Sequence, residues 1–570
     1  MRVFLLLLLL LPIKIWGLQN ICGNVYINSN EKFKFSKNDE VFICGDDASQ
    51  VWKNIPLNQK KYHISAVLQK SGYYAPTYSW EETDQRLIIH PGELTEVERV
   101  VFNNAPKPFT ESVRRKPYEG RLTADKLKEL QSWTTSHLQA VGYACPEVSA
   151  RANSTTGEIF IDMEPGRRMN IMEVERPNDP YNGIYRRFDA FEVGALFNQD
   201  LLNLTAQRIV LADLAQYSHF EVECKEDGAY LKQRAALGKP RLLTFSIGSS
   251  TEEAVITKLQ WKHARLGEQA STLKAEVSYT PRKQQFITNA QFYLFPDWVY
   301  TFFLPEVSVT RESEKSYETV QRKFGALLGH TEDNHEFRYY LKGGPYYNHL
   351  STLAGVGPRR SQYISWEGNA RIVSHYYEYY QASPREGYYL DLGYISQRKG
   401  IGSDLNADQL ALTGSQLFNF KLYDPPLHVL GVRFSLRTTI VEEKQFELLP
   451  QDYRLTLGGD DNIRGFGRKA INNNGAGYIT TAYLGLEWRF LQVLPYKIQP
   501  FVLLDAAQVG DETFALQSTL LWSPGLGLRW QSPIGAFRVT AARGRIEDAK
   551  GATRDLKADW VYFLSYGNEF

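Results

Sequence analysis

The chain has 570 residues, enough for more than one domain, and its formal net charge is only +1. A balanced charge gives no global attraction to nucleic acid or to a strongly acidic partner. The sequence contains no GxSxG, HExxH or P-loop motif, and its ten His residues show no metal-ligand spacing. Composition and motifs therefore indicate neither an enzyme nor a protein that binds a cofactor, a metal or nucleic acid.

The N-terminus has the pattern of a secretory signal peptide. Met1 and Arg2 provide a short positive start, residues 5–11 are all leucine, and Gly17 offers a small residue for cleavage. The apolar run is too short to span a bilayer as a permanent helix. We predict that residues 1–17 are a signal peptide that exports the chain, with an uncleaved anchor as the alternative.

Four cysteines lie in the N-terminal half, at Cys22, Cys44, Cys145 and Cys224. An even number in an exported chain predicts disulfides, although four cysteines allow three connectivities. We expect Cys22 to pair with Cys44, because the two are close in sequence and flank one small subdomain. A bond between Cys145 and Cys224 would cross a subdomain boundary, so the connectivity of these two stays open.

The N-terminal half repeats one pattern of a helix, a turn and a β-hairpin. Gly72-Tyr73 ends the first helix, Gly142-Tyr143 ends the second, and Ser218-His219-Phe220 stands at the same place in the third. The turn positions 72, 142 and 218 are 70 and 76 residues apart. This spacing predicts three α/β modules in series, which we place at residues 18–106, 107–176 and 177–240.

From about residue 241 onward, apolar and polar residues alternate as they do in strands. Leu484, Leu486 and Trp488, for example, alternate with Gly485 and Glu487. Such strands fit a membrane barrel with lipid outside and a polar lumen, or a soluble sandwich. The signal peptide and the 34 Tyr, 30 Phe and 11 Trp favour the barrel, because aromatic rings gather at membrane boundaries. We predict an all-β barrel of roughly 16 antiparallel strands in residues 241–570.

The last predicted strand, residues 560–570, ends the chain on an aromatic residue. Tyr562, Tyr566 and Phe570 lie on one face of this strand. We predict that this aromatic face is the signal that directs insertion of the barrel into the outer membrane.

The two strands that close the barrel have weak ends. Gly567 and Asn568 lie near the end of the last strand, and Gly248-Ser249-Ser250 ends the first strand, residues 242–247. These residue types are poor strand formers. We therefore expect fewer hydrogen bonds between the first and last strands than between the strands at residues 478–490 and 500–509.

A glycine- and aspartate-rich segment lies between two of the strands, at Leu455-Thr-Leu-Gly-Gly-Asp-Asp-Asn-Ile-Arg-Gly-Phe-Gly467. Its glycines allow tight folding, so that Arg464 can reach into the lumen. A guanidinium in that position needs a carboxylate, which it can bind through two hydrogen bonds. Asp505, on the strand at residues 500–509, is the partner that we predict. Asp460-Asp461 is better explained as a solvated turn than as a cation site.

Ile463-Arg464-Gly465-Phe466 resembles the (V/I)RG(F/Y) motif of outer-membrane barrels that carry periplasmic POTRA repeats and insert or secrete other proteins. Gly72-Tyr-Tyr-Ala-Pro-Thr77 and Gly527-Leu-Arg-Trp-Gln-Ser-Pro-Ile-Gly535 also resemble segments of this family. The similarity is greatest to its TamA branch, the barrel subunits of translocation and assembly modules. It covers nearly the whole mature chain and implies three POTRA-like β-α-α-β-β modules before the barrel.

The resemblance implies an outer-membrane location, with the N-terminal repeats in the periplasm. Unfolded outer-membrane proteins or autotransporters would be the clients, and a TamB-like protein anchored in the inner membrane would be a further partner. The motif would lie on a loop folded back into the barrel, and clients would enter through a lateral seam between the first and last strands. Two alternatives stay open, namely a two-partner-secretion type transporter and a passive structural barrel or pore.

Overall fold

The computed structural model describes residues 17–46, 54–112, 119–420, 424–532, 535–548, 553–554, 556 and 559–566. The chain divides into two compact units, and the boundary between them in the sequence lies between Arg168 and Met169. The predicted signal peptide, apart from Gly17, lies outside the described residues and stays a prediction. No helix in the described ranges is long and apolar enough to cross a membrane.

The first unit begins with an α/β module whose four-stranded sheet has the order β1-β2-β4-β3. The core lies between this sheet and two helices, where Ile27, Ile64 and Ile89 are fully buried. The elements are β1 (Gly17–Cys22), β2 (Val25–Ser29), α1 (Lys37–Cys44), α2 (Leu57–Lys70), β3 (Thr77–Glu81) and β4 (Arg86–His90). Strand β1 pairs with β2 and so precedes a complete β-α-α-β-β unit.

A disulfide joins β1 to α1 in this module, as the sequence predicts for these two cysteines. The sulfur atoms of Cys22 and Cys44 are 2.12 Å apart. The bond closes a loop of 22 residues and ties the additional strand to the first helix.

The second module has the same β-α-α-β-β order and a three-stranded sheet, β5-β7-β6. Its elements are β5 (Arg99–Asn103), α3 (Lys107–Ser112), α4 (Ala124–Ala140), β6 (Glu147–Asn153) and β7 (Glu158–Glu164). Helix α4 begins where the Thr123 hydroxyl accepts a hydrogen bond from the Lys126 backbone N–H. Its buried residues Leu130 and Leu138 pack on Ile159 of the sheet.

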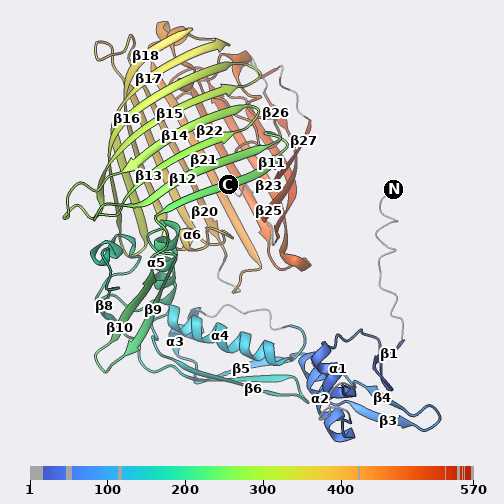
Figure 1. Ribbon diagram of the computed structural model, residues 1–570. Coiled ribbons are helices and arrows are strands. Elements are labelled where there is room, and N and C mark those ends of the chain that lie inside the picture. The colour runs from blue at the N-terminus through green and yellow to red at the C-terminus, as the bar shows by residue number, and fades with distance from the viewer. Residues whose placement is uncertain are drawn as a thin grey trace. The chain divides into compact units, whose positions relative to one another are not determined.

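The third module belongs to the second unit and leads directly into the barrel (Figure 1). Its sheet has the order β8-β10-β9. Its elements are β8 (Ile171–Glu175), the 3₁₀ helix η2 (Asn182–Phe188), α5 (Gln199–Leu211), β9 (Tyr217–Cys224) and β10 (Ala229–Ala236). Three β-α-α-β-β modules therefore precede the barrel, if η2 is counted as the first helix of the third.

The predicted boundaries of the second and third modules are wrong by about one strand. Strand β5 lies before residue 107 but pairs with β7, and β8 lies before residue 177 but pairs with β10. The cause is that each module begins with a strand parallel to its last strand, which a sequence pattern cannot distinguish from the end of the preceding module. The second module therefore begins by Arg99 and the third by Ile171.

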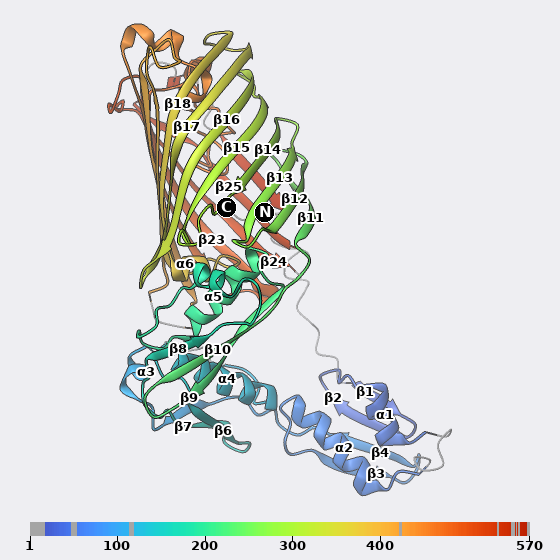
Figure 2. The same ribbon diagram turned by 60° about the vertical axis from the view of Figure 1, so that its left-hand side comes forward.

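The remainder of the chain forms a closed antiparallel barrel (Figures 1 and 2). Strands β25 and β26 both pair with β24 and are separated only by Gly544, so the described residues form 16 strands. The strands are β11 (Arg241–Ser250), β12 (Ile256–Leu266), β13 (Ser271–Tyr279), β14 (Lys283–Gln291), β15 (Thr301–Ser313), β16 (Glu318–Asp333), β17 (Phe337–Ala354), β18 (Arg360–Ser374), β19 (Gly387–Gln397), β20 (Ala407–Phe418), β21 (His428–Val441), β22 (Thr480–Phe490), β23 (Ile498–Gly510), β24 (Leu520–Ser532), β25 (Gly535–Arg543), β26 (Arg545–Glu547) and β27 (Trp560–Tyr566).

The alternation in the sequence matches the two faces of the barrel wall. On β22, Leu484 and Trp488 are 47% and 45% exposed on the outside, whereas Glu487 and Arg489 are buried on the luminal side. This arrangement places apolar side chains toward lipid and charged ones in the lumen. The prediction of an α+β repeat region followed by a 16-stranded barrel is confirmed.

Candidate functional site: the luminal loop and the barrel seam

The segment between β21 and β22 carries the predicted motif and folds into the barrel. It contains the short 3₁₀ helices η3 (Glu443–Leu448), η4 (Gln451–Tyr453) and η5 (Asn473–Gly475). Ile463 and Arg464 are fully buried, and Phe466 is 2% exposed. Ile463 and Phe466 pack with luminal side chains of β22, β23 and β24, among them Tyr483 and Val509. These apolar contacts hold the loop against one side of the lumen.

Arg464 binds two carboxylates that project from the barrel wall. Its Nε and Nη2 donate to the two oxygens of Asp505 at 2.9 and 2.8 Å, and its backbone N–H donates to Asp505 Oδ2 at 3.1 Å. Its Nη1 donates to Glu487 Oε2 at 2.7 Å. The structure thus brings together the predicted pair of Arg464 and Asp505, and it adds a second carboxylate.

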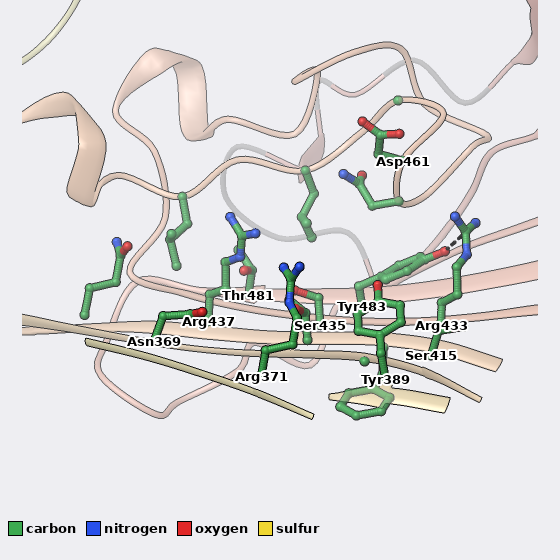
Figure 3. Close-up of a pocket in the computed structure, with 18 of the residues that line it drawn as sticks. Asn369, Arg371, Tyr389, Ser415, Arg433, Ser435, Arg437, Asp461, Thr481 and Tyr483 are labelled. Atoms are coloured by element: carbon green, nitrogen blue, oxygen red, sulfur yellow. Dashed lines mark hydrogen bonds between the residues drawn. The ribbon is translucent and has the colours of Figure 1, made fainter. Parts of the chain in front are cut away.

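The carboxylates belong to a larger polar network on β21, β22 and β23. Tyr483 donates its hydroxyl to Asp505 at 3.1 Å. Arg433 donates to the Tyr483 oxygen at 3.3 Å, the hydrogen bond that is dashed in Figure 3. Arg489 Nε donates to the other oxygen of Glu487 at 2.6 Å. Because each carboxylate is shared by several donors, the buried charges are compensated.

Gly465 allows the loop to approach the barrel wall closely. A Cβ at this position would lie 2.4 Å from the Ser523 Cβ and 2.5 Å from the backbone nitrogen of Gly544. Gly544 is the residue that interrupts the strand between β25 and β26. A side chain at either glycine would therefore push the loop away from the wall.

The same loop contacts both sides of the place where the barrel closes. Arg468 Nη1 lies 2.8 Å from Glu253 Oε1, in the turn between β11 and β12. Asp460 forms an ion pair with Arg538 on β25, which is the strand that pairs with β27. The loop is thus attached to the first hairpin and to the last strands of the barrel.

The described residues of the two strands that close the barrel make a short contact. Strand β11 pairs with β27 only through Ser249 with Tyr566 and Ser250 with Ser565, whereas β22 and β23 share ten residue pairs. Thr251 adds a backbone hydrogen bond to Leu564 at 3.0 Å. Among the described residues, 242–247 pair with β12 but not with β27. We call this contact the seam. Residues 567–570 lie outside the described residues, so the expectation of few hydrogen bonds between the two strands stays a prediction.

The predicted insertion signal is only partly visible. Tyr562 is 66% exposed on the outer face of β27, and Tyr566 stacks on Phe537 of β25 with ring centroids 4.6 Å apart. Phe570, Gly567 and Asn568 lie outside the described residues. Of the three predicted aromatic residues, the structure therefore shows Tyr562 on the outer face of the strand. The role of the strand in insertion stays a prediction.

Below the loop lies a luminal cavity of about 1220 Å³. Arg371 of β18 and Arg433 and Arg437 of β21 project into it, as Figure 3 shows. Arg371 Nε is 2.6 Å from Asp391 Oδ2. In the described parts of the chain, no group of three or more His, Cys, Asp or Glu could hold a metal ion. The cavity is therefore a lumen of mixed polar and apolar lining into which several arginine side chains project.

Several residues of this site carry no signal in the sequence. Glu487 and Arg489 are visible there only as members of the charged face of a strand, and nothing indicates that they meet the loop. Arg468 follows the motif directly, but its partner Glu253 is 215 residues away in the sequence. Long-range contacts of this kind depend on the barrel register, which a single sequence does not provide.

The turn between β11 and β12 should respond to pH through Glu252. Burial raises the pKa of Glu252 to about 7; Arg468 opposes this shift, and Asp460 adds to it. Since the pKa of Glu252 is raised above its usual value, the stability that its buried, protonated carboxyl gives to the turn is complete below about pH 4.5. This stability is lost as the pH rises through 7. We expect faster amide exchange in residues 458–468 at pH 8 than at pH 6, after correction for intrinsic rates. Glu252→Gln should remove this difference, and an equal difference in the variant would contradict the assignment.

The fold and the buried loop define a class, namely an outer-membrane β-barrel preceded by POTRA-like modules. In agreement, residues 308–555 match the model of the Omp85 superfamily domain. The barrel therefore contains an Omp85 superfamily domain, located in the outer membrane with the POTRA-like modules on the periplasmic side.

Solved structures with a similar fold include BamA from Haemophilus ducreyi lacking POTRA domains 1–3. It has a TM-score of 0.50 and 14% sequence identity, and the match covers 82% of this chain and 99% of that one. CdiB from Acinetobacter baumannii (TM-score 0.46, 11% identity, 83% and 89% coverage) and CdiB from Escherichia coli (0.45, 14%, 83% and 91%) are also similar. No curated protein sequence matches the chain.

Proposed function

We propose that the protein inserts or translocates other outer-membrane proteins through the seam of its barrel. The observation that carries this proposal is that, among the described residues, two residue pairs join β11 to β27 whereas ten join β22 to β23. An unpaired backbone group in lipid costs several kcal/mol, so a pairing of few residues separates more easily than a long one. A partly paired β11 offers an edge on which a client strand can form hydrogen bonds.

The POTRA-like modules supply the second part of the proposed function. Strands β3, β6 and β9 each lie at the edge of their sheets and have one strand neighbour. Edge strands bind extended peptides by strand addition, which needs no particular client sequence. Unfolded barrel proteins or autotransporters are therefore the clients that we propose.

Within the family, we propose a role like that of TamA. Three modules and 16 strands agree with the pattern that the sequence resemblance implies. A TamB-like periplasmic partner is part of this proposal. A two-partner-secretion type transporter is the alternative within the family, and a passive pore is the alternative outside it.

Folding of a client in liposomes tests the proposal. An unfolded outer-membrane β-barrel protein is diluted from urea into liposomes that contain this protein, and its folding is followed by heat-modifiable mobility in gels. We expect faster folding than in liposomes that contain a porin of similar size. Equal rates would favour the passive pore.

Removal of the last three residues should prevent stable insertion of the barrel. We expect the truncated chain to be degraded in the periplasm and to show no heat-modifiable mobility, because the aromatic face of the last strand is incomplete. Phe570→Tyr keeps an aromatic ring and should behave as wild type. A truncated chain that still shows heat-modifiable mobility would refute the prediction.

A further inference from the structure

A long turn between β18 and β19 lies at the end of the barrel next to the third module. This turn, residues 375–386, contains the short helix α6 (His375–Tyr379), and we call it the strap. Tyr377, Glu378, Gln381 and Pro384 of the strap line the luminal cavity. Figures 1 and 2 both show α6 beside α5 at this end of the barrel.

The strap reaches beyond its own two strands to more distant parts of the barrel wall. Gln531 of β24 donates its side-chain amide to the Ala382 carbonyl at 2.5 Å, and Arg489 of β22 donates to the Pro384 carbonyl at 3.1 Å. In the barrel, β24 is five strands away from β19. A turn that stayed with its own two strands would not meet these residues.

The third module holds the other side of the strap through a buried arginine. Arg208 of α5 is 3% exposed, and it donates to the two oxygens of Glu378 at 3.0 and 2.5 Å. It also donates to Asp333, at the end of β16, at 2.6 Å, and its Nη2 lies 3.3 Å from His375 Nδ1. The strap is thus fixed to the module by two charge-assisted hydrogen bonds between Arg208 and Glu378, which together are a strong and directional contact.

The strap is also connected to the loop that carries the motif. Arg489, which binds Pro384, also donates to Glu487, and Glu487 accepts a hydrogen bond from Arg464. Two sets of polar contacts, joined by the strap backbone between Glu378 and Pro384, therefore connect α5 to Arg464 of the luminal loop. Such a series lets a displacement at one end change the contacts at the other, provided that the strap has two positions.

We propose that the strap closes the module-side mouth of the barrel, and that the third module controls this closure through the pair of Arg208 and Glu378. In the present structure the strap spans the mouth. Movement of α5 away from the barrel would withdraw Arg208 from Glu378 and release the strap. This inference concerns the lumen and does not depend on the client or on the seam.

Ionic conductance of the full-length protein in planar lipid bilayers tests the proposal. In the first variant, Glu378→Gln, the ion pair with Arg208 is lost at nearly unchanged volume. In the second variant, a Gly-Ser linker replaces residues 376–385. We expect a low conductance for wild type and a probability of the open state about tenfold higher for Glu378→Gln, which corresponds to about 1.4 kcal/mol. The linker variant should be open throughout.

Lys232→Met is the matched control. Lys232 of β10 pairs with Glu175 of β8 at 2.7 Å, so the variant removes an ion pair that lies within the sheet of the same module. It should conduct as wild type. Heat-modifiable mobility shows which variants are folded. If folded Glu378→Gln has wild-type conductance, control by the module is wrong; if the folded linker variant also has it, the strap does not close the mouth.

Discussion

Arg464→Ala is expected to lower the free energy of unfolding of the barrel by about 3–5 kcal/mol, the usual cost of breaking a buried ion pair. Asp505 is fully buried and Glu487 is 3% exposed, so the loss of the guanidinium leaves Asp505 without its main donor and Glu487 with one donor fewer. The backbone N–H of residue 464 can still donate to Asp505 in the variant. The loop should nevertheless leave the wall, because the three side-chain hydrogen bonds to Asp505 and Glu487 are lost. The barrel should still insert, because its strands are unchanged.

The temperature at which heat-modifiable mobility is half lost measures this effect. Arg311→Ala is a suitable control, because Arg311 pairs with Glu318 at 2.7 Å but is 53% exposed. Such a surface pair contributes about 1 kcal/mol or less. Arg464→Lys should be intermediate, because an ammonium group keeps the charge but cannot bind both oxygens of Asp505 in a fixed fork. If Arg464→Ala and Arg311→Ala lose half of their heat-modifiable mobility at the same temperature, the motif does not anchor the loop.

The sequence predicts this contact because two independent patterns point to it. Alternation along residues 500–509 places Asp505 on the same face as Phe501 and Leu503, and the structure shows that this face is luminal. The glycines around Arg464 predict a loop that can fold inward. What alternation cannot provide is the shape of the lumen, and therefore Glu487 is missed as a second partner.

The strap is missed for a related reason. Tyr376, Tyr377 and Glu378 form part of a short polar and aromatic stretch in which no local pattern indicates a functional element. Its importance arises from Arg208, 170 residues earlier, and from Gln531, five strands away in the barrel. Contacts across a barrel mouth depend on closure of the whole sheet, which no local pattern encodes.

The seam is the central element of the proposed function, and a disulfide across it gives the second large effect. Ser250 and Ser565 are directly paired between β11 and β27, so Ser250→Cys and Ser565→Cys together place two thiols on adjacent strands. Once oxidised, the bond should prevent β11 from separating from β27. We expect client folding in liposomes to fall to the rate of liposomes without the protein.

The most direct test compares this crosslink with one placed between strands that do not need to separate. Ala482→Cys with Gln508→Cys joins β22 to β23, which are paired along ten residues. The account predicts that oxidation abolishes client folding in the seam variant but not in the β22–β23 variant, and that reduction restores it. Equal client folding by the oxidised and reduced seam variants would contradict insertion through the seam.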